Sequence, residues 1–386
     1  MRSRVEAMPK KCLAIMRREF FYMWRDRSLR YILLIGPLLG LILFYATYSA
    51  PVIKAIPTAV VDLDRTMASR ELSDQFRNTE YFKVVAFPEN FAEAEKLLQA
   101  GSVTVGIVIP EDFARNTSLG RQSNIAIMID GSNIAYATNA TNAVLLVTRA
   151  ISAKIGVKTL VARGIQLTEA QEAYQSITFR EERWFNPALN YAYFLVLALA
   201  LNFWQQCCML AACMNVIGET GMNSRLQLKA MGVSKLQLFA GKSVAHIAAF
   251  MIMALPIYAL SFYIFKLPLQ CSFRLLFLFT LVFAVSLHSI GTLMSSFSNS
   301  AVNASRFGMI IALPSFVLCG YTWPLEAMPH YLQQLVKVLP QTWFFQGLNY
   351  LTFKNPGWGF ISHYFLAMIV IALVCYGTAA IITSRN

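Results

Sequence analysis

Six long runs of apolar residues, each free of charged side chains, constrain the fold of this chain more than any other feature. An α-helix needs about 20 residues to cross roughly 30 Å of hydrocarbon, so each run predicts a membrane-spanning helix. Only 14% of the 386 residues are charged, against about 25% in an average soluble domain. The sequence therefore predicts a polytopic α-helical membrane protein with six spans. The six runs are 31–50, 189–217, 243–265, 275–294, 307–325 and 360–382.

Lysine and arginine gather in the short segments on one side of these runs. Residues 1–30 contain nine basic and three acidic residues, and the loop after the second run contains four basic residues and a single acid, Glu219. Because short basic loops stay in the cytoplasm, both termini are expected there. The formal net charge of +13 then lies mainly at the cytoplasmic edge of the membrane. It suits anionic membrane lipids and forms no continuous surface for nucleic acid.

The composition divides the chain into four parts. Residues 1–30 alternate bulky apolar and basic residues, which predicts a cytoplasmic amphipathic helix at the membrane interface before the first span, 31–50. Residues 51–187 alternate strand-like and helix-like segments, which predicts an extracytoplasmic α/β domain with helical stalks. Residues 188–386 hold spans two to six and, at 324–354, an expected outer re-entrant hairpin. The expected strands of the α/β domain are 58–61, 82–87, 103–109 and 124–129, and its expected helices are 66–77, 91–100, 111–116, 133–163 and 168–180.

No motif in the sequence predicts catalysis or a metal site. Gly241-Lys242-Ser243 resembles the end of a phosphate-binding loop, but Leu236 stands where that loop requires glycine. The four histidines are scattered along the sequence, and none of the six runs contains a carboxylate to pair with them. The seven cysteines form no CxxC pair, so buried thiols are expected rather than metal ligands. The chain is therefore expected not to be an enzyme.

Polar side chains near the middle of two runs are candidates for the lining of a substrate path. Asn202, Gln205 and Gln206 lie in the second run, and Ser286 and His288 lie in the fourth. Polar residues at this depth are rare and mark transport routes or subunit seams. The alternative is hydrogen bonding between helices, worth about 0.6 kcal/mol per bond. The sequence leaves both interpretations open.

The segment 218–242, GETGMNSRLQLKAMGVSKLQLFAGK, has five charges and four glycines between two apolar runs. Its glycines bracket a stretch, 223–231, that predicts a short helix lying across the ends of two spans. Arg225 and Lys229 keep such a helix in water, while Leu226 offers an apolar contact. A short helix held by two stiff spans transmits a push to them, because packed helices shift as rigid bodies. A plain cytoplasmic loop is the alternative.

Several motifs, in order along nearly the whole chain, resemble those of the type 2 ATP-binding-cassette (ABC) export permeases with a large external domain after the first span. Near the amino terminus these are Arg18-Glu19-Phe20, Arg25-Asp26 and Pro37. In 51–187 they are IPTAVVD at 56–62, GIVIPEDF at 106–113 and DGSN at 130–133. Glu219, Gly221, Leu226 and Leu228 with Gly241-Lys242 are similar to the coupling-helix segment, and PLEAMP at 324–329 is similar to the outer hairpin.

The resemblance implies the permease subunit of an ATP-driven exporter in a bacterial inner membrane. ATP and Mg are then bound by separate cytosolic ATPase subunits, so no cofactor is expected in this chain. A second permease, identical or different, is an expected partner, and a periplasmic adaptor protein is a further candidate. The resemblance places contacts with the ATPase in 1–30 and in the coupling helix 219–231, at Arg18, Glu19, Arg25, Asp26, Glu219, Arg225, Leu226 and Lys229. It places an outer gate at Pro324, Glu326, Pro329 and Trp343.

Two functions stay open at this stage. A path lined by Asn, Gln, Ser and aromatic residues suits an amphipathic substrate, such as a drug, a lipid or a peptide-like molecule, that leaves the cytoplasm or the inner membrane. The alternative is a mechanotransmission or signalling protein whose external domain binds a ligand or an envelope partner while no substrate crosses the spans. Replacing Gln205 or His288 by leucine distinguishes the two functions. If a substrate passes the spans, these changes should reduce export; if the chain only transmits a signal, function should be lost only through changes in 51–187.

Overall fold

The computed structural model describes residues 2–48, 54–174, 182, 184–217, 230 and 232–385. The chain divides into two compact units, one made of Met1–Ala50 with Trp184–Asn386 and the other of Pro51–Arg183. Each unit has its own hydrophobic core.

In the first unit, six helices within the described residues are long and apolar enough to cross a membrane. Each coincides with one of the six predicted runs, which confirms the prediction of a polytopic helical membrane protein. The helices are α2 (Arg27–Tyr48), α8 (Tyr191–Ala212), α11 (Lys235–Ala259, continued by the π-helical η1, Leu260–Ile264), α12 (Phe273–Phe297), α13 (Ala301–Leu318) and α16 (Trp358–Arg385).

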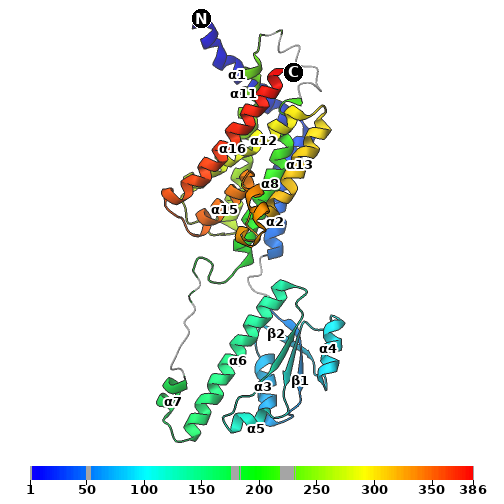
Figure 1. Ribbon diagram of the computed structural model, residues 1–386, viewed down its shortest axis with the longest axis vertical. Helices are drawn as coiled ribbons and strands as arrows, with labels where there is room; N and C mark the ends of the chain where they lie inside the picture. Colours follow the sequence, from blue (N-terminus) through cyan, green and yellow to red (C-terminus); the bar gives the residue numbers. More distant parts are fainter. Residues whose placement is uncertain are drawn as a thin grey trace. The chain divides into compact units, whose positions relative to one another are not determined.

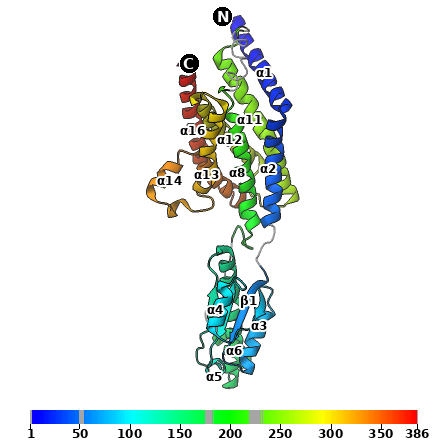
Figure 2. The ribbon, with the colours of Figure 1, turned by 90° about the vertical axis from the view of Figure 1, so that its right-hand side faces the viewer.

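The fourth spanning helix, α12, is the core of this unit. It has the largest buried share of the six spans and packs against α8, α11, α13 and α16 (Figures 1 and 2). Its aromatic side chains stack on a helix outside the six, with the rings of Phe283 and Phe344 3.9 Å apart. By contrast, α2 and α16 bury only 24% and 22% of their most apolar stretches. Their outer sides are therefore available to lipid or to a second subunit.

A further helix, α1 (Arg2–Arg25), precedes the first span and ends at Asp26, where the chain enters α2. It packs along α11. Leu13, Phe21 and Trp24 remain exposed on it. The amino end of α1 and the carboxyl end of α16 lie at one end of this unit, and the carboxyl end of α2 and the amino end of α8 lie at the other (Figure 1). A helix is thus present where the sequence predicts an amphipathic one, and its place at the cytoplasmic membrane surface stays a prediction.

The region predicted as a hairpin, 324–354, contains three short helical elements. They are η2 (Leu325–Ala327), α14 (His330–Val336) and α15 (Pro340–Phe353). In α14 only Val336 is buried, whereas α15 buries ten of its 14 residues against α12, α13 and α16. Pro340 suits the first position of α15, where its missing N–H has no helical partner to lose. The segment 324–354 is therefore half embedded in the unit, with α14 on its outside (Figure 2), and its role as an outer re-entrant hairpin stays a prediction.

The second unit is an α/β domain around a four-stranded sheet with the order β2-β1-β3-β4. β1 (Ile56–Asp62) pairs in parallel with β2 (Phe82–Ala86) and β3 (Val105–Ile109), and β4 (Ala126–Ile129) pairs antiparallel with β3. The central strands are buried on both faces, as expected for parallel strands covered by helices. Strands are thus present at the four places where the sequence predicts them.

Helices cover both faces of this sheet (Figure 1). α3 (Met67–Arg77) and the long α6 (Ile134–Ala162) pack on one face, together with the short α5 (Phe113–Ser118). α4 (Phe91–Gln99) packs on the other face through Ala94. The Asn133 side chain, in the turn predicted before the long helix, accepts hydrogen bonds from the first N–H groups of α6 and so fixes where it begins. α7 (Leu167–Tyr174) follows, and the rest of the predicted helix 168–180, residues 175–180, lies outside the described residues.

Candidate functional site

A buried carboxylate on α1 is the starting point of the site. Glu19 is 4% exposed, and its Oε1 lies 3.4 Å from Lys242 Nζ and 3.2 Å from His246 Nε2, both on α11. Arg18 Nη2 lies 3.8 Å from the other oxygen, Oε2. Lys242 is also buried, at 1% exposed. Glu19 therefore joins α1 to the third spanning helix through an ion pair that is shielded from solvent.

The close packing of α1 on α11 depends on a glycine. A Cβ atom at Gly241 would lie 2.9 Å from the Ile15 side chain and 3.0 Å from the Cys12 carbonyl oxygen. Real Cβ atoms essentially never show the first distance, and the second is tighter than most of their contacts, so a larger residue at position 241 would push the two helices apart. Lys242 and His246 follow Gly241 by one and five residues, and this approach brings them within reach of Glu19. Gly241-Lys242 is thus a packing motif rather than part of a phosphate loop.

The hydrogen bonds continue from His246 into two more spans. His246 Nδ1 lies 3.1 Å from His288 Nε2 on α12, and His288 Nδ1 lies 2.8 Å from the Tyr376 hydroxyl on α16. One assignment of protons satisfies all three hydrogen bonds with both imidazoles neutral. In this assignment His246 Nε2 donates to Glu19, His288 Nε2 donates to His246 Nδ1, and the Tyr376 hydroxyl donates to His288 Nδ1. We call these five residues, Glu19, Lys242, His246, His288 and Tyr376, the polar joint.

The electrostatics of the polar joint favour an ionised Glu19. Burial alone raises the pKa of this carboxyl, but the hydrogen bond from His246 and the positive charges of Lys242 and Arg18 outweigh it and lower the pKa to about 2. The carboxylate is therefore charged at any physiological pH. Removing one partner of a buried ion pair typically costs about 3–5 kcal/mol, because the other charge is left uncompensated. The polar joint thus resists separation of α1 from α11.

A second group of polar contacts connects the polar joint to the segment after α8. Asn215 Nδ2 donates to Thr292 Oγ1 on α12 at 3.0 Å and lies 3.3 Å from Ser243 Oγ on α11. Ser295 Oγ on α12 accepts hydrogen bonds at 3.0 Å from the backbone N–H groups of residues 216 and 217. The chain is therefore fixed to α11 and α12 immediately before the predicted coupling segment begins.

The residues predicted to contact an ATPase differ in their surroundings, and only those near the amino terminus are among the described residues. Glu19 is buried in the polar joint, Arg18 is beside it, and Arg25 is exposed at the end of α1. Asp26 lies between α1 and α2, and its carbonyl oxygen accepts a hydrogen bond from the Arg30 N–H. The predicted coupling helix 219–231 lies outside the described residues except Ala230, and so do its site residues, Glu219, Arg225, Leu226 and Lys229.

The residues predicted to line a substrate path lie in two places, one on α8 and the other on α12. Gln205 is buried, and its Nε2 donates to Asn202 Oδ1 at 2.9 Å and to Ser315 Oγ on α13 at 3.1 Å. Gln206 is half-buried on the same helix, α8. His288 belongs to the polar joint, and Ser286, two residues before it on α12, is buried with no hydrogen-bond partner for its hydroxyl among the described residues.

The residues predicted to form an outer gate also lie in two places. Pro324 and Glu326 line a small cavity of about 210 Å³ together with Asn349 and Lys354. Pro329 is exposed before α14. Trp343 is half-buried in α15, where its Nε1 donates to the Lys337 carbonyl oxygen at 2.8 Å. The Trp343 side chain thus ties the start of α15 to the end of α14.

Sequence reasoning missed Lys242, His246 and Tyr376. The expectation that the histidines stand apart with no carboxylate partner is wrong, because Glu19 reaches His246 from a helix 227 residues earlier in the chain. A usable signal was present: Lys242 and His246 are four residues apart at the start of an apolar run, where charged or titratable side chains require partners. Among the described residues, no three His, Cys, Asp or Glu side chains are grouped as metal ligands would be.

Comparisons with known proteins give the family. The sequence profile described as ABC-2 family transporter protein matches residues 27–381. The chain is 23% identical over 326 residues to the probable multidrug ABC transporter permease YbhR of Escherichia coli K12, over 84% of this chain and 85% of YbhR. It is 22% identical over 330 residues to the inner membrane transport permease YhhJ of the same strain, over 84% of each chain. Because the profile covers almost all of both units, this chain belongs to the ABC-2 family of transporter proteins and is a multi-pass transport permease.

Proposed function

We propose that this chain is the permease subunit of an ATP-driven ABC exporter that moves an amphipathic substrate out of the cytoplasm or the inner membrane. Separate cytosolic ATPase subunits bind ATP and Mg and supply the force. The family assignment and the names of the relatives, two of them probable multidrug ABC transporter permeases, support this proposal. The chain performs no chemistry of its own; it offers alternative packings of its spans, and the ATPase shifts the equilibrium between them.

The observation that supports this function most directly is the polar joint. An ATPase that pushes on α1 or on the coupling segment 219–231 moves α11 as well, because Glu19 is paired with Lys242. His288 and Tyr376 extend the connection to α12 and α16. One ion pair and three hydrogen bonds thus make four helices respond as one body. The contacts of Asn215 and Ser295 give the coupling segment its own connection to α11 and α12.

The surface of α1 supports a place between lipid and a cytosolic partner. Leu13, Phe20, Phe21 and Trp24 are exposed on it beside the basic Arg17. Together with α11 they line a broad groove of about 1210 Å³. In this arrangement both termini lie in the cytoplasm and unit 51–183 lies outside. There it is in position to meet a periplasmic adaptor, while a second permease, identical or different, packs on the spans.

The substrate path and the outer gate remain part of the proposal. The path is lined by polar residues of α8 and α12, namely Asn202, Gln205, Gln206, Ser286 and His288. The gate is formed at the hairpin by Pro324, Glu326, Pro329 and Trp343. Export that persists at the normal rate in both Gln205→Leu and His288→Leu would contradict a path here and favour the mechanotransmission alternative.

The polar joint gives the first test of this function. Glu19→Gln keeps the size of the side chain but removes its charge, so α1 loses its ion pair with α11. In the complex with its ATPase, we expect basal ATP hydrolysis to be retained and substrate-stimulated hydrolysis and export to fall at least about tenfold. Asp74→Asn, which breaks an exposed ion pair with Arg77 in the second unit, is the matched control and should change neither rate. Unchanged stimulation in Glu19→Gln would show that force does not pass through the polar joint.

A further inference from the structure

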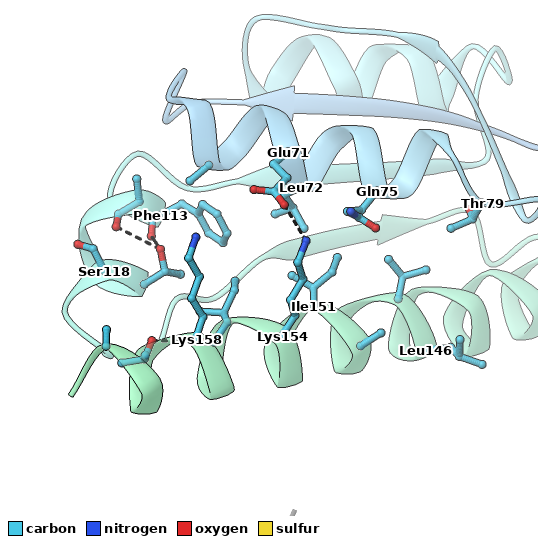
Figure 3. Close-up of a pocket in the computed structure, with 18 of the residues that line it drawn as sticks. Glu71, Leu72, Gln75, Thr79, Phe113, Ser118, Leu146, Ile151, Lys154 and Lys158 are labelled. Carbon is cyan, nitrogen blue, oxygen red and sulfur yellow. Dashed lines mark hydrogen bonds and ion pairs between the residues drawn. The ribbon is translucent and has the colours of Figure 1, made fainter. Parts of the chain in front are cut away.

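The second unit has a groove that the transport proposal does not use. All four buried residues of α6, from Ala140 to Val147, lie in its first half. From Ile151 onward its side chains are only partly buried or exposed. The second half of α6, together with α3 and α5, encloses a groove of about 820 Å³ (Figure 3). This volume lies within the range of about 300–1,000 Å³ that is typical of small-molecule sites.

The floor of the groove is apolar. Leu72 of α3, Phe113 of α5 and Val147 of α6 line it at 2%, 4% and 6% exposure, and Ile151 and Ile155 continue it along α6. Figure 3 shows Leu72 and Ile151 between α3 and α6, with Phe113 toward one end. Burying apolar surface on such a floor is favourable for a ligand with a hydrocarbon portion.

Basic side chains line the groove above this floor. Lys154, Lys158 and Arg163 line it from α6 and the residue that caps its end, while the single acidic residue of the lining is Glu71 on α3. Lys154 Nζ is 2.8 Å from Glu71 Oε1, so that pair is neutral. Lys158 points into the groove (Figure 3), and neither it nor Arg163 forms an ion pair within the described part of the chain. Since 51–187 as a whole contains 14 basic and 15 acidic residues, this positive rim is a local feature.

The Glu71–Lys154 ion pair restricts the groove to a slender ligand. The Glu71–Lys154 ion pair runs across it from α3 to α6, and α5 bounds it at the Phe113 end. A helix with side chains is about 10 Å or more in diameter, so a partner helix does not fit under that bridge. A single hydrocarbon chain does fit.

We propose that this groove binds a single-chain amphiphile with an anionic head, of the class of long-chain carboxylates. The hydrocarbon chain lies on the floor between Leu72, Phe113 and Ile151, beneath the Glu71–Lys154 bridge. The head group lies at Lys158 and Arg163, where ionised donors make strong hydrogen bonds to a carboxylate. This binding function goes beyond the proposed export function and does not rest on it.

A fluorescence titration tests the proposal on the full chain. The protein is placed in phosphatidylcholine nanodiscs without its ATPase, with empty nanodiscs as the blank, and titrated with cis-parinarate, a fluorescent long-chain carboxylate that has no bulky label. We expect saturable binding at one probe per chain, displaced by hexadecanoate but not by hexadecanol or hexadecyltrimethylammonium. Lys158→Glu should weaken binding at least about tenfold, and Ala150→Trp, which places a large side chain in the groove, should abolish it.

Lys96→Glu is the matched control, because Lys96 is exposed on α4 at the opposite face of the sheet. It should leave the affinity unchanged, and the unfolding midpoints of all three variants should match that of the unaltered chain. Equal affinity for the cationic amphiphile, or unaltered binding in both groove variants, would overturn the proposal. A third result would also overturn it: two Ala150→Cys chains cross-link to each other, and the cross-linked pair no longer binds the probe. The groove would then be an interface between copies of the chain. The titration contains no ATP, so it does not depend on the export function. If the unaltered chain does not bind the probe but still supports export in the complex with its ATPase, this proposal alone is rejected.

Discussion

At the scale of a single residue, the environment of Glu19 in the structure differs from the one expected from the sequence. In the sequence it follows Arg18 in a basic amphipathic segment, where an exposed contact to another protein is the natural expectation. In the structure it is buried and faces Lys242 and His246. A buried ion pair is weak evidence for net stability, but it defines a geometry, because any other arrangement leaves an uncompensated charge. At the residue scale, the polar joint therefore specifies how α1 sits on α11.

The lowered pKa of Glu19 predicts how stability depends on pH. The pKa of about 2 in the folded chain lies below the ordinary glutamate pKa of 4.5. The ionised carboxylate therefore contributes stability that is fully present above about pH 4.5 and is lost as the pH falls toward about 2. We expect the difference in thermal unfolding midpoint between the unaltered chain and Glu19→Gln to be constant from about pH 8 to about pH 5. It should then shrink between about pH 4.5 and about pH 2.

Thermal unfolding in detergent solution, followed by tryptophan fluorescence, measures this difference. Asp74→Asn, in which an exposed pair is lost, serves as the control and should show little difference at any pH. A difference that changes mainly between about pH 6 and pH 7 would mean that histidine charge, rather than the Glu19 carboxylate, governs the polar joint.

At the scale of elements, small residues decide how closely the spans pack. A Cβ atom at Gly291 on α12 would lie 2.4 Å from the Ala212 Cβ at the end of α8 and 3.0 Å from that residue's carbonyl carbon. Backbone atoms cannot move aside as a flexible side chain does. The closeness of α8 and α12 thus depends on Gly291, as that of α1 and α11 depends on Gly241.

This contact predicts opposite outcomes for two glycines in spanning helices. Gly291→Ala should lower the free energy of unfolding by about 1–3 kcal/mol, the usual cost of overpacking. Gly377→Ala on α16 meets nothing within 4 Å and should leave stability unchanged or slightly raised, because alanine is the better helix former. Thermal unfolding midpoints of the two variants in the same detergent provide the comparison. Equal midpoints would show that α8 and α12 are not in close contact.

The elements themselves were largely predictable from the sequence. The runs of apolar residues gave all six spanning helices, and the alternation in 51–187 gave four strands and the helices between them. These signals are local, since a window of about 20 residues contains all the information needed. The polar joint was not predictable in this way, because its ion pair joins residues 19 and 242 and depends on the helix approach that Gly241 permits.

At the scale of the whole molecule, the proposed topology of six spans predicts that both termini lie on one side of the membrane and residues 51–187 on the other. The distribution of lysine and arginine predicts that the side of the termini is the cytoplasm. We therefore expect Asn299, in the loop between α12 and α13, on the cytoplasmic side and Lys96, on α4, on the outer side; both are exposed.

Cysteine labelling in intact cells tests this orientation. A membrane-impermeant maleimide should react with Lys96→Cys in whole cells and with Asn299→Cys only after the cells are opened. The unaltered chain gives the background, because five of its seven cysteines are buried and Cys12 and Cys375 are partly so. The reverse pattern of labelling would invert the topology and remove the proposed cytoplasmic coupling of the polar joint.

The sequence by itself determined that this chain has six stretches long and apolar enough to cross a membrane, where its α/β unit lies along the chain, and that its motifs resemble those of export permeases. Hydrophobicity and periodicity act over neighbouring residues, so they can be read without knowing the fold. Only the tertiary structure decided which polar side chains meet. Burial in an apolar core forces each charge or imidazole to find a partner, and helix packing determines which partners are within reach.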